Sequence, residues 1–304
     1  MSILKPKLFG EIFDTPLMIH PGKAKSAMVG LGGRIVDGGV VFSADGIDAV
    51  DHWVDPQAGL LVDRQGHRME RDGRLPFDMV NGVAVIPIEG TLVHKGAFIG
   101  QSSGETSYQG IQTQINLAAK SREVKAVVFE MDSYGGQVAG AFQTAEMIRR
   151  LSAMKPTMAI LTDFAYSAGY LLGSQARKMV MPQHGGAGSI GVITMHADFS
   201  RQIEEMGVSV TILAAGEQKA KGNPYEPLDD AYVAATRQEL EGMRQSFAEA
   251  VSLGRQGRIS KADALKTEAG CFDGKEAKRL GLVDAVGNPI DAFAEFVAAV
   301  NRAR

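Results

Sequence analysis

The sequence predicts an α/β protein in which stacked strand–helix units surround a largely parallel sheet. From Val80 onward, short β-branched runs alternate with segments whose apolar residues recur at helical spacing, and the pattern repeats at roughly 30 residues. Apolar residues make up 45% of the 304-residue chain, which is enough for a sizeable core. A chain of this length has room for one large domain or two modest ones.

The expected strands are apolar runs bounded by turn residues. They cover residues 82–88, 124–131, 157–161 and 209–213. Helices are expected where apolar residues repeat every three or four positions, as Ile111 and Ile115 do. They cover residues 108–120, 138–154, 229–255, 260–268 and 290–301, and a further helix begins at Ser167. Pro156 ends the helix before it because proline cannot continue a helical hydrogen-bond pattern.

The first 78 residues have a different texture, rich in glycine, aspartate and arginine and poor in apolar periodicity. We expect residues 1–78 to form a small, loosely structured lead-in segment with one helix near 22–32. The main domain is expected over residues 79–288. Residues 289–304 should add a C-terminal helix.

Composition and charge exclude several classes of function. The net charge is −3, so there is no electrostatic reason to expect nucleic acid or an anionic membrane as a partner. The single cysteine, Cys271, excludes an internal disulfide and a multi-cysteine metal site. No histidine lies in an HExxH pattern, and we expect no metal and no cofactor. Charged residues interrupt the N-terminal apolar run, and no apolar stretch reaches membrane length, so neither a signal peptide nor a transmembrane helix is expected.

Two motifs follow neighbouring predicted strands. In the first, Asp132 to Gly136, two glycines let the backbone turn and approach a ligand, and amides near the next helix would stabilise an anion. The second centres on Ser167, at a strand-to-helix transition crowded with small residues. In a parallel sheet the two lie side by side at the carboxyl ends of the strands, where ligands bind. Taken alone, each is also compatible with a plain turn or a helix cap.

Two later motifs are less specific. Gly188 to Val192 is compatible with an ordinary glycine-flanked turn, and the polar loop that follows residue 215 contains Lys219 and Lys221. Lysines in such loops are usually solvated, and the local sequence does not distinguish these two.

His184 and His196 are close enough in sequence to Ser167 to be considered as bases. A serine–histidine–acid triad lacks support because no G-x-S-x-G motif is present.

Taken in order, the four motifs resemble the signal peptide peptidase A family of Ser–Lys serine peptidases, which has the ClpP/crotonase-like fold. Within that family the sequence is most similar to the phage capsid-assembly (head maturation) proteases, the group of the lambda protein C. The core resemblance covers about residues 80–287, and a weaker one covers the N-terminal segment. Further phage-type features are Thr15–Pro21, Thr106–Ile111, Val138–Phe142 and Gly222–Tyr225.

The resemblance implies a role for each matching residue. Ser167 matches the nucleophile, and Lys219, rather than Lys221, matches the general base. Ser189 matches a serine that orients the lysine, and the amides of Gly136 and Ala168 match the oxyanion hole. Lysine accepts a proton only when neutral, which burial in an apolar site favours.

Two positions depart from the family pattern. Tyr134 stands where proline is common, and Ala168 stands where glycine is common. Neither change removes a catalytic side chain, since the oxyanion donors are backbone N–H groups, although Tyr134 would narrow the substrate groove.

The implied function is a serine endopeptidase that cleaves phage scaffolding or portal proteins, or itself, during head assembly. Its location would be the host cytoplasm or the interior of the prohead. The resemblance also implies a homo-oligomeric ring in which Ser167 and Lys219 meet across a subunit interface. Two alternatives remain: a crotonase-type acyl-CoA enzyme and a catalytically silent structural protein of the phage head.

Overall fold

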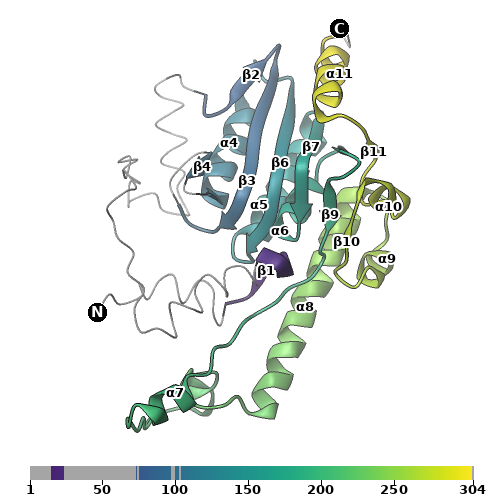
Figure 1. Ribbon diagram of the computed structural model, residues 1–304. Coiled ribbons are helices and arrows are strands. Elements are labelled where there is room, and N and C mark those ends of the chain that lie inside the picture. Colours follow the sequence, from purple (N-terminus) through teal and green to yellow (C-terminus); the bar gives the residue numbers. More distant parts are fainter. Residues whose placement is uncertain (1–14, 24–72, 74, 97–99, 103, 303–304) are drawn as a thin grey trace.

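The computed structural model describes residues 15–23, 73, 75–96, 100–102 and 104–302 (Figure 1). The helix expected near 22–32 lies almost entirely outside the described residues, as does most of the segment 1–78. Among the described residues, no helix is both long and apolar enough to cross a membrane.

The fold is built on a mixed sheet whose centre is parallel, as the sequence predicts. The described strands are joined in the order β10-β9-β7-β6-β3-β5-β4, with β1, β2, β8 and β11 paired to the side. Their bounds are β1 Leu17–Ile19, β2 Asp78–Val80, β3 Val83–Val93, β4 Gln101–Ser102, β5 Glu105–Ser107, β6 Ala126–Gln137, β7 Thr157–Tyr166, β8 Lys178–Met181, β9 Gly186–Gly188, β10 Cys271–Phe272 and β11 Ala285–Val286. All neighbours of β7 run parallel to it, and β8 and β9 pair with opposite ends of that strand.

Helices cover both faces of the sheet (Figure 1). Their bounds are α4 Tyr108–Lys120, α5 Ala141–Met154, α6 Ala168–Gly173, α7 Ser200–Glu205, the 3-10 turn η1 Glu217–Ala220, α8 Asp230–Arg255, α9 Lys261–Lys266, α10 Gly274–Arg279 and α11 Pro289–Arg302. Alternate residues of β6 point to different cores, with Val127 and Phe129 in the large one and Val128 in the smaller one beneath α11. This period of two is the one that a strand buried on both faces requires.

Most expected elements are present, and α4 has the expected bounds. The helix expected from residue 138 begins three residues later, at Ala141, because Gly140 has a left-handed φ of 88°. Such a backbone conformation ends an extended segment and suits glycine. The expected turn at 132–136 is wrong: these residues continue β6. Pairing with β3 on one side and β1 on the other holds the two glycines in the sheet.

The strand expected at 209–213 is also absent. These residues have high β-propensity, but none of the described strands pairs with them. They belong to a projecting arm, which we define as residues 191–246. None of its residues is buried, and the first buried residue after it is Phe247. Figure 1 shows the chain leaving β9 along an extended stretch toward α7 and returning to α8.

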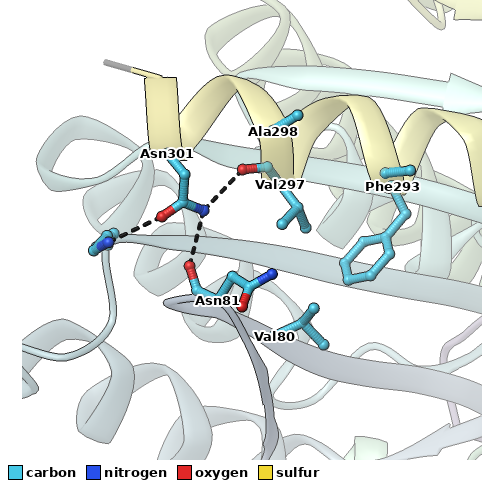
Figure 2. Close-up of a pocket in the computed structure, with 8 residues that line it drawn as sticks. Val80, Asn81, Phe293, Val297, Ala298 and Asn301 are labelled. Atoms are coloured by element: carbon cyan, nitrogen blue, oxygen red, sulfur yellow. Dashed lines mark hydrogen bonds between the residues drawn. The ribbon is translucent and has the colours of Figure 1, made fainter. Parts of the chain in front are cut away.

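The C-terminal helix α11 is attached to the sheet by polar contacts at its last turn. Figure 2 shows Asn301, whose side-chain nitrogen donates to the backbone oxygens of Asn81 and Val297, each at 2.9 Å. The Lys125 ammonium donates to the Asn301 oxygen at 3.0 Å. A hollow of about 700 Å³ lies beside these residues, and none of the expected catalytic residues lines it.

Candidate active site

Ser167 lies at the junction between β7 and α6, where the backbone is strained. Its φ and ψ angles are 54° and −120°, a region that side chains other than glycine rarely occupy. The residue is fully buried, and its Oγ has no hydrogen-bond partner among the residues that the structure describes. Its N–H donates to the Gly188 oxygen at 2.9 Å, which fixes the turn. A buried hydroxyl with no partner, held at a strained helix start, is available to react.

Ala168 follows as the first residue of α6, and its N–H is one of the unpaired donors that begin any helix. Small residues make this junction possible. A β-carbon added at Gly169 would lie 3.1 Å from Ser133 Cβ, so a larger residue would push α6 away from β6. The small residues around Ser167 are therefore explained by close packing of the two chain segments.

The two glycines of β6 lie directly beside Ser167. A β-carbon added at Gly135 would lie 3.0 Å from both the Ala168 nitrogen and Ser167 Cβ, and Gly135 has a φ of 94°. A β-carbon at Gly136 would overlap the Leu92 carbonyl oxygen of β3. The sequence prediction that these motifs lie side by side is therefore confirmed, and both positions require glycine.

Ser189 lies beside the same junction. It is nearly buried, has a φ of 57°, and donates its N–H to the Gly270 oxygen at 2.8 Å. Its hydroxyl is hydrogen-bonded to the thiol of Cys271. Burial raises the pKa of that thiol, and the contact with Ser189 offsets part of the rise.

Lys219 is not brought to Ser167 within this chain. It lies in η1 on the projecting arm and is exposed, and no hydrogen bond or ion pair between described residues joins it to the site. Lys221 forms an ion pair with Asp229 at 2.5 Å. Among the described residues, the single chain therefore presents the Ser167 hydroxyl without a lysine beside it.

The other polar groups near the site favour their uncharged forms. Burial raises the pKa of Asp132, and the neighbouring Asp163 raises it further. Burial also raises the pKa of Tyr134, and that of Tyr166 to about 12. Burial is the first cause of each of these shifts, and exclusion of water strengthens the attraction between amide donors and a developing oxyanion.

Apart from Tyr134, which was expected to narrow the substrate groove, sequence reasoning did not assign the aromatic residues that extend the site. The rings of His20, Tyr134, Phe164 and Tyr166 form one cluster, with His20 4.9 Å from Tyr166. The segment Thr15–Pro21 did stand out as a phage-type feature, but its sequence gave no indication that it lies against the catalytic motifs. No group of described histidine, cysteine or acidic side chains could hold a metal ion.

Comparison with known proteins places the chain in a family. The family model described as "Peptidase family S49" matches residues 149–301. The capsid assembly protease C of Escherichia phage lambda is 33% identical over 95% of this chain and 64% of its own length. The head-tail preconnector protein GP5 of Enterobacteria phage P21 is 33% identical over 97% of this chain and 57% of its own length.

The chain thus spans less than two thirds of either relative's length. Among solved structures, a mutant of ClpP1 from Listeria monocytogenes is similar, with a TM-score of 0.40 and 15% identity over 67% of this chain and 90% of that one. The extent of the match to the two phage proteins and the match to the family model lead to one conclusion: the chain belongs to peptidase family S49.

Proposed function

We propose that this chain is a serine endopeptidase with Ser167 as nucleophile and Lys219 as general base. The observation that carries the proposal is the buried, unpartnered Ser167 hydroxyl in a strained turn beside the amides of Ala168 and Gly136. A carbonyl carbon placed against Ser167 Oγ would have its oxygen facing those amides. That arrangement is the requirement for acyl transfer.

The chemistry follows from these positions. Neutral Lys219 takes the Oγ proton while the oxygen bonds to the scissile carbonyl carbon, and the Gly136 and Ala168 amides hold the oxyanion. The C–N bond breaks when the amine leaves with a proton from the lysine. Water then adds to the acyl-enzyme, and the carboxylate product leaves.

Lys219 reaches the site from a neighbouring subunit in this proposal. The arm that carries it exposes large apolar side chains, with Leu213 92% and Met206 70% exposed, beside the stretch 209–213, which pairs with no described strand. Exposed apolar residues next to unpaired backbone indicate a surface that another chain covers. Because the arm lies on one subunit and the nucleophile on the next, the contact is head-to-tail and closes into a ring.

A hollow next to Ser189 supports the same arrangement. It has a volume of about 230 Å³ and is lined in part by Ile19, Ser189, Gly191 and Ala269. A lysine side chain of a neighbouring subunit that entered this hollow would be buried beside the Ser189 hydroxyl. Burial would favour its neutral form, and Ser189 would orient it.

The proposed substrates are proteins of a phage head, namely scaffolding and portal proteins, cleaved in the host cytoplasm or inside the prohead. The support is the names of the two relatives, a capsid assembly protease and a head-tail preconnector protein. Incubation with scaffolding and portal proteins, read by mass spectrometry, tests this part. Absence of any cut in either protein by an enzyme that cleaves casein would contradict it.

Complementation tests the shared site. Ser167→Ala and Lys219→Ala subunits are each inactive, and we expect an equal mixture, unfolded and refolded together, to recover about a quarter of wild-type casein cleavage. The fraction arises because half of the subunits supply an intact serine and half of their neighbours an intact lysine. Zero activity in correctly assembled mixed rings would contradict the shared site.

Lys221→Ala is the matched control, since it removes an exposed lysine two residues away that is already paired with Asp229. We expect at most a mild loss of activity. A loss as large as that of Lys219→Ala would contradict the assignment of Lys219 as the base.

A further inference from the structure

The strand β1, which lies far from the core strands in sequence, occupies the edge of the sheet at the candidate active site. It pairs antiparallel with the end of β6, with Met18 opposite Gly136 and Ile19 opposite Gly135. On its other side, Leu17 exchanges two hydrogen bonds with Ile193, of 2.8 and 2.9 Å. The segment is therefore held on both edges, as an extended peptide is when it adds a strand to a sheet.

The hydrogen-bond pattern places the Met18 carbonyl at a specific donor. His20 N–H donates to Tyr134 O at 2.8 Å, and Val138 N–H donates to Pro16 O at 3.5 Å. Hydrogen-bonded pairs alternate with non-bonded ones along an antiparallel ladder, so the pair between these two, Met18 with Gly136, is a bonded one. The Gly136 N–H thus faces the Met18 carbonyl oxygen.

The same oxygen lies next to the second proposed donor and the nucleophile. A β-carbon added at Gly135 would overlap the Met18 oxygen and would lie only 3.0 Å from both the Ala168 nitrogen and Ser167 Cβ. The carbonyl oxygen of Met18 therefore faces the Gly136 N–H and lies near Ala168 and Ser167. It borders the space that the oxygen of a scissile peptide bond must enter, between the two amide donors.

The side chains fix this register. The Met18 side chain is fully buried and belongs to the large core, whereas the neighbouring Ile19 borders the hollow beside Ser189. Beyond them, the His20 ring packs on Tyr134 and Tyr166, and Lys23 lies 4.6 Å from the centre of the Tyr134 ring. A slip by one residue would turn Met18 out of its pocket, so the position of the carbonyl is specified.

We infer that the segment 15–20 of this chain is bound as a substrate and that the Met18–Ile19 peptide bond is the first bond cleaved. The inference rests on the proposed function and adds to it the position of the bond. It also assigns specificity: the pocket next to Ser167 accepts an apolar side chain that is not branched at the β-carbon, such as that of methionine, and the leaving side accepts an aliphatic residue.

The reaction uses only water besides the chain itself. Ser167 Oγ bonds to the Met18 carbonyl carbon while its proton passes to the base, and the bond from that carbon to the Ile19 nitrogen breaks as the nitrogen takes up the proton. Water then hydrolyses the ester and leaves a carboxylate on Met18. The free amine of Ile19 and the cleaved segment can then leave the groove, which becomes open to other chains.

The test is intact-mass measurement and N-terminal sequencing of the assembled full-length chain. We expect the wild type and the matched control Met18→Leu to yield a chain that begins at Ile19. Ser167→Ala should remain uncut, and Met18→Asp should be cut at least tenfold more slowly because a carboxylate would be buried in the pocket. If Met18→Asp does not fold, a synthetic peptide of residues 15–23 and its Met18→Asp version give the same comparison in trans.

Casein cleavage and labelling of Ser167 by a fluorophosphonate separate a failure of the inferred cleavage site from a failure of the proposed peptidase function. An enzyme that cleaves casein but leaves the Met18–Ile19 bond intact, in its own chain and in the peptide, overturns the inference and leaves the proposed function standing. Equal cutting of the 15–23 peptide and its Met18→Asp version also overturns it. A wild-type chain that neither cleaves casein nor is labelled overturns both.

Discussion

Replacement of Gly135 by alanine tests whether the space between β6 and Ser167 is the catalytic space. A methyl group at this position would lie 3.0 Å from the Ala168 nitrogen and from Ser167 Cβ, closer than nearly all real carbon contacts, and would overlap the Met18 carbonyl oxygen. The methyl would therefore occupy the volume in which a substrate carbonyl has to lie. We expect the Gly135→Ala enzyme to lose peptidase activity.

Gly135→Ala should affect both the stability of the protein and its catalytic rate. The φ of 94° at Gly135 makes any other residue strained, and left-handed backbone costs alanine about 1–2 kcal/mol. The effect on catalysis should be larger, because loss of one oxyanion donor reduces kcat by about 10²–10³-fold. Gly257→Ala is the matched control: its φ is 84°, and nothing lies within 4 Å of an added β-carbon. It should show the backbone strain without the loss of activity.

The assay compares casein cleavage, fluorophosphonate labelling and urea unfolding for the two variants. We expect a loss of stability in both, larger in Gly135→Ala because its methyl group would also overlap the Met18 oxygen, and a loss of cleavage of at least 100-fold only in Gly135→Ala. Wild-type cleavage by Gly135→Ala would refute the placement of the substrate carbonyl. Equal loss of cleavage in Gly257→Ala would show that strain, rather than occupied space, limits the enzyme.

Two further outcomes are expected. Asp284→Ala should reduce the free energy of unfolding by about 3–5 kcal/mol, because it leaves the fully buried Arg255 guanidinium without the carboxylate that it contacts twice at 3.0 Å. Glu249→Ala is the control, since it removes the exposed partner of Lys261. It should change the free energy of unfolding, measured in urea, by less than about 1 kcal/mol. Ser189→Ala should lower the rate of casein cleavage less than Ser167→Ala does, since Ser189 orients the base without forming a bond, and a loss as complete as that of Ser167→Ala would give it a different role.

The sequence predicted those elements that depend on residues nearby in the chain or on contacts that any parallel sheet provides. The helix at 108–120 has a serine N-cap at Ser107 and a clear apolar face, and it forms over the predicted residues. The strands at the centre of the sheet are long apolar runs that find a neighbour on either side in any parallel arrangement. The junction at Ser167 was also predictable, because a cluster of small residues at the end of a strand marks a close approach of backbone.

The remaining features depend on partners that are distant in the chain. The glycines of β6 favour a turn locally, yet pairing with Leu92 and Met18 keeps them extended. The residues of one strand do not determine which other strand pairs with it, so the position of β1 could not be derived from the sequence. Conversely, residues 209–213 have strand composition, but no strand in the described part of the chain lies beside them.

The arm that carries Lys219 also carries the predicted strand that does not form. Both a strand-like stretch without a partner and a base without its nucleophile lie on one arm in which no residue is buried. In the proposed assembly, a second chain would supply both the strand beside residues 209–213 and the serine beside Lys219. One absent partner would then account for both observations. In the proposed mechanism a single copy is inactive for two separate reasons, since Lys219 lies away from Ser167 and the groove is filled by the chain's own strand. Assembly would remove the first barrier, and the first cleavage would remove the second. The proposal therefore fixes the order of these two events: no bond would be cut until a neighbouring subunit supplied the base.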